Sequence, residues 1–402
     1  DWEVAASLYD YAKDRKRQNG AGTLADGNGT GWNTLALKGI WRPDGTNGAH
    51  LMDFGFQRDS YQLAYLTSNA VGSWIDGPAG TVVSDVGGMT RLQSLYAQDS
   101  WAFAPRWKAV LGGRAEWWTT FNGFTRIPGA APAVDSQWPQ RKESYFSPKA
   151  ALSWQWLPDT VLKASAGRAV RFPTVGELYG ATSTVNSQYI NDPNLKPEKS
   201  WTSELSAEKD LGNGLLRLTF FTENTRDALY SQTTFDTLAN RNVSRVQNVG
   251  RIRTQGLELA YNGNDVLAKG LDLGASITYA DSVIKENAGF VARPGDTIGK
   301  QQPNIAKWRA TALLSYRWDA RWTTSVGARY SGPQFRTLDN SDVNGDTYQG
   351  VSKFFTADLR VRYQLNKNVN AAFGIDNLNN DKFWNFHPYP QRSYVAELQM
   401  AI

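Results

Sequence analysis

The chain has 402 residues, a net charge of +5 at pH 7 and no cysteine, which excludes disulfides, thiol nucleophiles and cysteine-ligated metals. Only 41% of its residues are hydrophobic and its mean hydropathy is −0.49, yet it holds 16 tryptophans, a residue type that prefers boundaries between water and apolar material. No run of about 18 apolar residues occurs, which excludes a transmembrane helix.

Apolar and polar residues alternate with a period of two along many segments, and this pattern predicts strands. The first residues, DWEVAASLYDY (1–11), already follow it, as do 203–211 and 214–221 further along. In 356–365 one face carries Ala, Leu, Val, Tyr and Leu, and the other carries Asp, Arg, Arg and Gln. One apolar and one charged face, repeated in long strands, predicts a barrel with lipid outside and water inside.

Short and long connections alternate between these strands. Turn-forming residues predict tight turns at 105–106, 157–159, 212–214, 319–320 and 366–368. Long segments rich in Gly, Asn, Ser and Asp lie near 15–32, 65–89, 121–142, 169–200, 227–250, 283–304 and 332–352. This alternation is typical of outer-membrane barrels, which have short periplasmic turns and long external loops.

Many tryptophans lie within a few residues of a short connection. They are Trp41, Trp101, Trp107, Trp154, Trp156, Trp318 and Trp322. This placement predicts an interfacial aromatic girdle on the periplasmic side. The alternative, tryptophans packed in a soluble core, is disfavoured because a single soluble core would not bury so many charged strands.

The connections predict about 16 strands, the first running upward from Asp1 and the last downward to Ile402. The expected fold class is all-β, a transmembrane antiparallel up-and-down β-barrel, and residues 1–402 form one barrel domain. The expected location is the outer membrane of a Gram-negative bacterium, which the chain crosses many times.

Short motifs in a fixed order carry a family resemblance. They are RFPT at 171–174 with ELY at 177–179, DPNLKPE at 192–198, NVG at 248–250 with GLE at 256–258, and NL at 377–378 with Asn380. Their order and spacing across 171–402 resemble those of the TonB-dependent outer-membrane receptors, whereas residues 1–170 match only in their barrel pattern. The prolines of the second motif fix φ and remove donors, so they define where the next strand begins.

The resemblance implies a larger protein. Members of the family surround an N-terminal plug with roughly 22 strands, so we expect the plug and about six first strands to precede Asp1. It also implies energy-dependent uptake of a ferric siderophore, the transported ligand, without a cofactor and without bond chemistry. The implied partners are a TonB-type inner-membrane energy transducer acting through the plug and outer-membrane lipid and lipopolysaccharide, with no nucleic acid and a monomeric receptor.

The sequence narrows the cargo. A haem receptor would be expected to carry a histidine between the motifs at 171 and 195, and none is present. Copper carriers favour loops rich in methionine and histidine, but this chain has 3 Met and 2 His. Siderophores are therefore favoured over another large anion or a glycan.

Candidate ligand contacts lie in the external loops. Many ferric siderophores are anionic and carry aromatic or amide groups, which arginine and aromatic side chains suit. The candidates are Arg168, Arg171, Tyr179 and Tyr189 in one loop, Phe335, Arg336 and Tyr348 in a second, and Trp384, Phe386, His387 and Tyr389 in the last. Alternatively, these aromatics pack the loops together or form the outer girdle, and the arginines bind lipopolysaccharide phosphates.

Other functions have less support in the sequence than the receptor. A passive porin of roughly 16 strands, monomeric or trimeric, would fit if Asp1 were the true start. Catalysis would need a positioned base, but His50 and His387 are expected at opposite ends of the barrel. Basic residues are interleaved with acidic ones, which disfavours nucleic-acid binding.

One segment begins like a calcium loop. Asp342, Asn344 and Asp346 alternate as in an EF-hand, but Thr347 and Lys353 occupy its sixth and twelfth positions. The segment therefore predicts turn hydrogen bonds rather than a metal site, and no metal site is expected in the chain.

Overall fold

The computed structural model describes residues 1–12, 14–18, 22–73, 75–129, 133–180, 183–184, 187–236, 241–288 and 296–401. In that part of the chain the regular structure is nearly all β, with a sheet of 21 strands, a separate two-stranded hairpin and a helix of 5 residues. No helix in the described part of the chain is long and apolar enough to cross a membrane.

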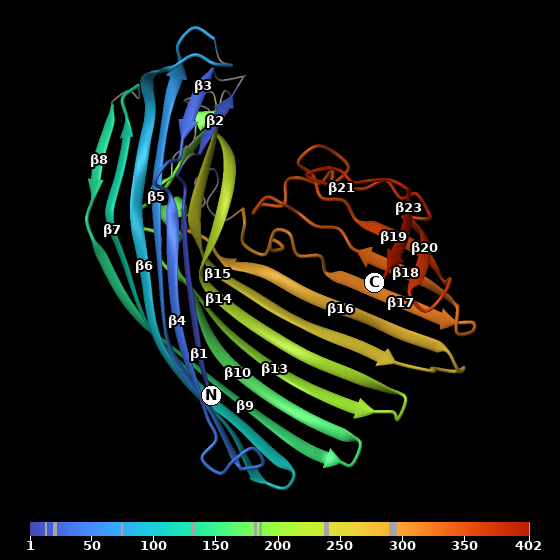
Figure 1. Cartoon of the computed structure of the whole chain (residues 1–402). Helices are drawn as coiled ribbons and strands as arrows, with labels where there is room; N and C mark the ends of the chain where they lie inside the picture. The colour runs from blue at the N-terminus through green and yellow to red at the C-terminus, as the bar shows by residue number, and fades with distance from the viewer. Residues whose placement is uncertain are drawn as a thin grey trace.

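Sixteen long strands of the described chain form an up-and-down meander, in which each pairs antiparallel with the next. They are β1 (Trp2–Asp10), β4 (Gly31–Trp41), β5 (His50–Ala70), β6 (Ala79–Ala104), β7 (Trp107–Ile127), β9 (Arg141–Leu157), β10 (Thr160–Arg171), β13 (Glu198–Asp210), β14 (Gly214–Asp236), β15 (Arg241–Gly263), β16 (Leu271–Glu286), β17 (Trp308–Arg317), β18 (Trp322–Ser331), β19 (Phe354–Gln364), β20 (Val369–Asp376) and β23 (Ser393–Met400). The series curves continuously into a barrel wall (Figure 1). The predicted fold class and strand number are confirmed.

The remaining elements lie in the long connections. They are β2 (Arg15–Gln18), β3 (Thr23–Asp26), β8 (Val134–Trp138), α1 (Val175–Tyr179), β11 (Ser183–Thr184), β12 (Ser187–Ile190), β21 (Trp384–Asn385) and β22 (His387–Pro388). β12 adds to the sheet by a parallel pairing with β15, and β21 with β22 forms the separate hairpin.

Short connections gather at one end of the wall and long ones at the other, as predicted. The short ones are 42–49, 105–106, 158–159, 211–213, 264–270, 318–321 and 365–368. The prediction of loops near 65–89, 121–142 and 227–250 is wrong for most of each range. There β5, β6, β7, β14 and β15 continue as paired strands. The hydrogen bonds between paired strands join backbone groups, so a polar sequence outside the membrane does not interrupt the pairing.

The wall has one polar and one apolar face. On the polar face ion pairs join neighbouring strands, as between Arg329 and Asp358 (3.1 Å) and between Arg360 and Asp376 (3.2 Å). On the other face Leu205, Phe373 and Leu398 leave at least half of their surface exposed. An exposed apolar face of this extent is the lipid face of a membrane barrel.

The polar face is the inner, concave one. Trp118 shares a face of β7 with Glu116, two residues away, and it packs in one cluster with α1 and with Val246 of β15. Strands as distant in the series as β7 and β15 are bridged by α1 only if α1 lies inside the curve of the wall.

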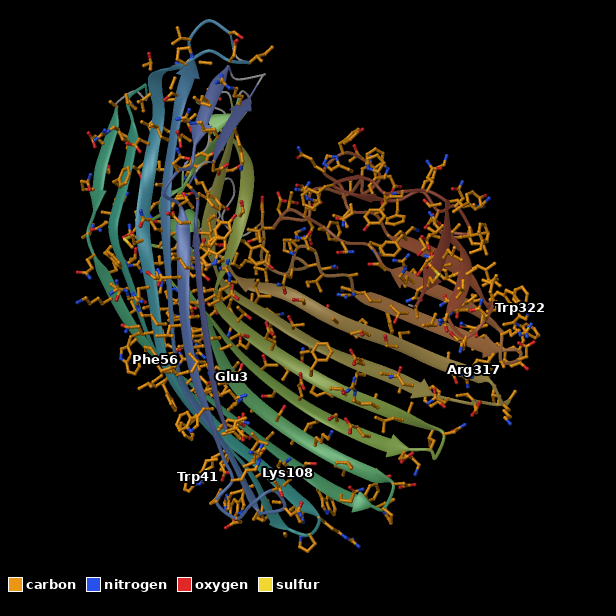
Figure 2. All side chains as sticks on the ribbon, in the orientation of Figure 1. Glu3, Trp41, Phe56, Lys108, Arg317 and Trp322 are labelled. Carbon is orange, nitrogen blue, oxygen red and sulfur yellow. The ribbon has the colours of Figure 1, made fainter. Side chains whose placement is uncertain are left out.

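Aromatic side chains line the short-turn end of the outer face. Trp107 stacks on Trp154 with ring centroids 5.1 Å apart, and Trp101 contacts Phe103 at 5.2 Å. Figure 2 shows Trp41 and Trp322 at this end of the wall. Their position supports the predicted interfacial girdle.

The turn 318–321 depends on a carboxylate. Asp319 Oδ1 accepts hydrogen bonds from the backbone N–H groups of Arg321 (2.7 Å) and Trp322 (2.8 Å), and these bonds lower the pKa of Asp319. A carboxyl group whose pKa is lowered by folding stabilises the fold above its unfolded pKa, and this stability disappears as the pH falls through the folded pKa.

We therefore expect Asp319→Ala to destabilise the barrel at about pH 7 and to differ less from the unmodified protein at about pH 3. Asn366 makes the same two turn bonds in 365–368 with an amide that does not titrate (2.9 and 3.0 Å), so Asn366→Ala is the matched control. Urea unfolding in lipid vesicles at the two pH values measures both. A deficit of Asp319→Ala that stays constant with pH would contradict this account.

Candidate functional site

The long connection between β10 and β13 turns inward. A capping box begins α1, in which Thr174 Oγ1 accepts from the N–H of Glu177 (3.1 Å) and Glu177 Oε2 accepts from the N–H of Thr174 (2.8 Å). Arg171 donates to the other oxygen of the same carboxylate at 2.6 Å. These bonds fix how the chain leaves β10 and enters the helix.

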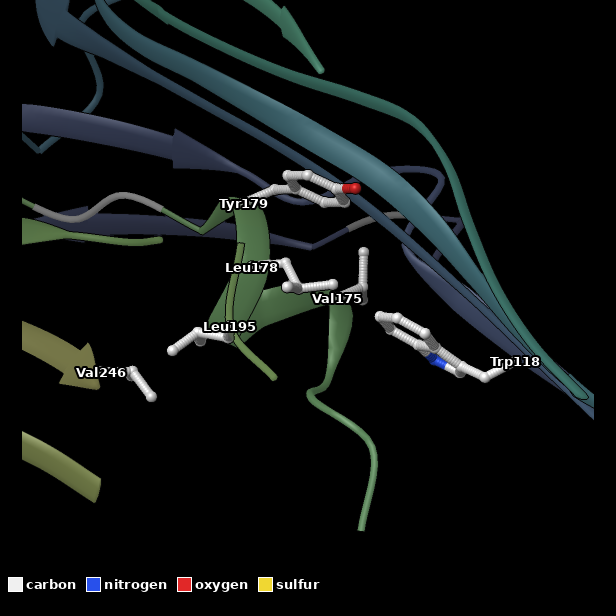
Figure 3. Close-up of a cluster of buried hydrophobic side chains, with 6 residues drawn as sticks. All are labelled: Trp118, Val175, Leu178, Tyr179, Leu195 and Val246. Atoms are coloured by element: carbon white, nitrogen blue, oxygen red, sulfur yellow. The ribbon is translucent and has the colours of Figure 1, made fainter. Parts of the chain in front are cut away.

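α1 buries its apolar side against the inner wall. Val175, Leu178 and Tyr179 pack with Trp118, and Leu195 and Val246 complete the cluster on the other side of the helix (Figure 3). The Tyr179 hydroxyl lies 2.5 Å from Thr120 Oγ1. We call this group, Trp118, Val175, Leu178, Tyr179, Leu195 and Val246, the wall cluster.

Two of the sequence motifs meet beside the wall cluster. Asn248 Oδ1 accepts from the N–H of Lys196 (2.9 Å), and Asn248 Nδ2 donates to the Lys196 carbonyl (2.9 Å). Arg141 of β9 donates to the carbonyls of Pro193 (2.5 Å) and Leu195 (3.1 Å). These motif residues hold the returning chain against the wall, which is an architectural role.

The candidate ligand residues of this connection are dispersed. Tyr179 is 1% exposed, so its ring has no surface for a ligand in this arrangement. Arg168 donates to the Phe146 carbonyl (3.2 Å) and lies over the ring of Tyr145, whose centroid is 5.8 Å away. Arg171 pairs with Glu177, and the side chain of Tyr189 lies outside the described residues.

The other candidates come together. The connection 332–353, between β18 and β19, meets the connection 377–392, between β20 and β23, at the long-connection end (Figure 1). We call the group formed there the aromatic–arginine cluster, and it consists of Arg336, Tyr348, Trp384, Phe386, His387 and Tyr389. Phe335 belongs to the same loop, and its carbonyl accepts from the N–H of Asn304 (2.7 Å).

Ring and charge contacts define the cluster. The Arg336 guanidinium carbon lies 3.8 Å from the centroid of the Phe386 ring, a cation–π contact. Tyr348 contacts Trp384 edge-on at 5.0 Å and His387 at 5.9 Å. Tyr348, Phe386 and Tyr389 are exposed by 65%, 43% and 49%, so the cluster offers aromatic surface to an incoming molecule.

Packing beneath the cluster holds its rings in place. Phe383 is 8% exposed and lies between Phe354 of β19, at 4.5 Å, and Tyr389, at 4.8 Å, in a stacked arrangement. Asn377 Nδ2 donates to the Asp381 carbonyl and Asn377 Oδ1 accepts from the Asp381 N–H, both at 2.8 Å. The cluster therefore rests on a buried aromatic layer and a fixed corner of the chain.

Arg336 is positioned by a carboxylate at its backbone. Asp342 accepts from the N–H of Arg336 (2.7 Å) and from Thr337 Oγ1 (2.7 Å), so the predicted turn role of this segment is confirmed. Burial lowers the pKa of Arg336, and the negative charge of Asp342 partly opposes this. Arginine remains protonated in proteins, so the cluster carries a permanent positive charge.

A hollow of about 360 Å³ lies beside the cluster, and it is lined in part by Trp384, Phe386, Tyr389, Gln334 and Arg329. Arg329 belongs to the ion pairs of the inner face, so the hollow joins the loops to the charged interior. Among the residues described, no group of three His, Asp or Glu side chains is arranged to hold a metal ion.

The sequence predicted the exposed members of this site but not their support. Phe383 and Phe354 had no distinguishing pattern, because a buried ring and an exposed ring look alike in a loop sequence. The proximity of Phe383 to the Asn-rich corner at 377–380 is the signal that could have marked it.

Sequence comparisons place these features in context. A family model described as "TonB dependent receptor-like, beta-barrel" matches residues 1–378. The probable TonB-dependent siderophore receptor PiuA of Acinetobacter baumannii is 24% identical over 298 residues, 72% of this chain and 37% of that protein. The probable TonB-dependent receptor BfrD of Bordetella pertussis is 24% identical over 311 residues, 77% of this chain and 39% of that protein. The chain thus spans less than half the length of these relatives.

Solved structures share the fold. The copper transporter OprC superposes with a TM-score of 0.74 at 16% identity, covering 99% of this chain and 61% of that one. The ferric citrate transporter FecA in its unliganded form gives a TM-score of 0.70 at 16% identity, covering 99% and 57%. The siderophore receptor PiuA from A. baumannii gives 0.63 at 18% identity, covering 93% and 55%.

Proposed function

This chain belongs to the TonB-dependent receptor family and forms a β-barrel of the outer membrane, and from that premise we propose that the whole protein binds a ferric siderophore and imports it with energy from the inner-membrane TonB complex. Membership in a receptor family places the chain outside the enzymes. It also favours the receptor over the passive porin, the alternative that strand number alone left open.

The aromatic–arginine cluster carries the proposal. It combines a permanent cation, Arg336, with the partly exposed rings of Tyr348, Phe386 and Tyr389. Anionic chelates with aromatic groups gain both charge-assisted hydrogen bonds and ring contacts from such a surface. Its position at the long-connection end faces the outside of the cell.

The composition argues for an anionic iron chelate over a soft metal ion. OprC is a copper transporter, but copper ligation favours methionine and histidine, of which this chain has 3 and 2. FecA transports ferric citrate, an anionic chelate without aromatic rings. Such a chelate would contact the arginine of the cluster but gain nothing from its aromatic surface.

In the proposed mechanism the external loops capture the chelate, and no bond is made or broken. The chelate then passes along the ion-paired inner face when a plug, pulled by the TonB-type transducer, moves aside. We further propose that the receptor acts as a monomer in contact with outer-membrane lipid and lipopolysaccharide. We propose that the receptor needs no cofactor, because the ferric chelate is the transported ligand.

Binding by the whole receptor tests the proposal. We expect Arg336→Ala to weaken binding of a ferric triscatecholate about 10- to 100-fold, because a charged hydrogen bond contributes about 1.5–3 kcal/mol. We expect Trp384→Ala to weaken it about tenfold. Arg321→Ala, which removes an arginine at the short-turn end, is the control and should leave the affinity unchanged.

Quenching of tryptophan fluorescence measures the affinity for a ferric triscatecholate, a ferric trishydroxamate and ferric citrate. Uptake of ⁵⁵Fe by cells with and without the TonB complex measures the energy requirement. Equal affinity of Arg336→Ala and the unmodified receptor for all three chelates would remove the cluster from the site. Uptake that persists without the TonB complex would remove the energy-coupled mechanism.

A further inference from the structure

A histidine–aspartate pair lies on the outer face of the wall. His50 begins β5, and Asp99 lies on the neighbouring strand β6, where His50 is opposite Trp101 and Met52 is opposite Asp99. Because side chains alternate along a strand, both share the face that carries the exposed Phe54. His50 Nδ1 lies 2.8 Å from Asp99 Oδ2.

This position is unusual for ionisable side chains. Carboxylates on the inner face meet permanent cations, as Asp53 meets Lys38 on the adjoining strand at 3.7 Å. Asp99 instead lies on the outer face, and its partner is a histidine, which is charged only when protonated.

Asp99 has unused hydrogen-bonding capacity. Its Oδ1 atom is buried and accepts no hydrogen bond from the described residues, which is a costly state for a carboxylate oxygen. The terminal torsion of aspartate is broad, so a small rotation brings either oxygen toward the surface. The Asp99 carboxylate therefore lacks one hydrogen-bond donor, and the described residues do not supply it.

A hollow adjoins the pair. It measures about 590 Å³, and its lining includes Asp99, Trp41, Met52, Phe54 and Leu111. Its walls are largely apolar and it opens on the lipid face, so it fits hydrocarbon. The ring of His50 is stacked on Trp101 at 5.6 Å and 10°, which holds the imidazole beside Asp99.

The depth of the pair identifies the occupant. Trp41 and Trp101 belong to the girdle at the short-turn end, which marks the level of lipid head groups in the periplasmic leaflet. We propose that the His50–Asp99 pair binds the head group of an ammonium-bearing phospholipid, and that the adjoining hollow takes the start of an acyl chain.

The chemistry of the two partners is complementary. A primary ammonium has three donors, which supply the missing bonds to the Asp99 carboxylate. Protonated His50 has donors on both ring nitrogens, so Nδ1 stays with Asp99 while Nε2 meets the lipid phosphate. A trimethylated ammonium has no donor, and a glycerol head group has hydroxyl donors but no positive charge, so neither gives the Asp99 carboxylate a hydrogen bond from a cation.

Native mass spectrometry of the whole, delipidated receptor tests the site. The probes are phosphatidylethanolamine, phosphatidylcholine and phosphatidylglycerol with identical acyl chains. We expect phosphatidylethanolamine to bind about tenfold more tightly than the other two. Asp99→Asn should abolish that preference, and His50→Gln should weaken both phosphatidylethanolamine and phosphatidylglycerol.

Glu208→Gln is the matched control, because Glu208 also lies near the short-turn end, on β13, but pairs with Lys163 on the inner face (2.6 Å) and does not line the hollow. It should keep the preference. Leu111→Trp fills the hollow beside Asp99 and leaves the His50 and Asp99 side chains unchanged, so it should also reduce binding, which covers the case that Asp99→Asn fails to fold. Equal affinity of the unmodified receptor for the three lipids, or a preference retained by Asp99→Asn, would overturn the proposal. Either result leaves the cargo proposal untouched, because the two sites are at opposite ends of the barrel.

Discussion

Leu205→Arg should lower the free energy of unfolding of the barrel by about 2–4 kcal/mol, the cost of a cationic side chain on the lipid face near the membrane midplane. Leu205 is 60% exposed and is paired with Ala164 on one side and Phe220 on the other. The small Ala164 leaves room for a longer side chain, so the substitution creates no steric conflict. The effect therefore isolates the solvation of the charge.

Ser206→Arg, one residue further along β13, is the control. Ser206 lies on the inner face between Glu204 and Glu208 and opposite Lys163 of β10, so a new cation there meets water, two carboxylates and one ammonium. We expect a change within about 0.5 kcal/mol. Urea unfolding in phospholipid vesicles measures both variants, and equal destabilisation by the two would mean that the faces are assigned wrongly.

This contrast between adjacent residues explains why the strands could be predicted. A strand with lipid on one face and water on the other must alternate apolar and polar residues. Each strand can therefore be predicted from a few neighbouring residues, as 356–365 can. Turn residues are equally local, and the tight turns predicted at 105–106 and 366–368 lie where the structure has short connections.

The extensions of the strands beyond the membrane were not predictable in the same way. There both faces meet water or loops, so the period-two signal fades while backbone pairing continues, as between β14 and β15 up to the pair Asp236–Arg241. Gly and Asn in these parts predict loops. Their presence in a ladder follows from the hydrogen bonds of neighbouring backbones, which a single sequence does not reveal.

The site was predictable in composition but not in geometry. Loop chemistry predicts Arg336 and Trp384 separately, yet their place in one cluster depends on the stack of Phe354, Phe383 and Tyr389 between β19 and the connection 377–392. Tyr179 shows the opposite case. The loop that was expected to present it outward is drawn inward by the capping box and by apolar packing, which are long-range consequences of the curved wall.

The inward packing of Tyr179 leads to the second large effect, at Gly123. A Cβ built on Gly123 of β7 would overlap the Tyr179 ring, and one built on Gly88 of β6 would lie 2.6 Å from its Cδ2 atom. We expect Gly123→Ala to lower the stability of the packed segment 172–180 by about 1–3 kcal/mol, the usual cost of overpacking. Amide hydrogen exchange of α1 measures this local opening directly.

A double-mutant cycle separates this mechanism from a general loss of strand stability. Tyr179→Ala should by itself cost about 3–5 kcal/mol, because it empties the centre of the wall cluster and removes the bond to Thr120. In that background Gly123→Ala should be nearly neutral, because the ring that it would strike is gone. Additive effects of the two substitutions would show that Gly123 acts through the sheet alone. Strong coupling would instead make the contact between Gly123 and Tyr179 the feature that holds the β10–β13 connection inside the barrel.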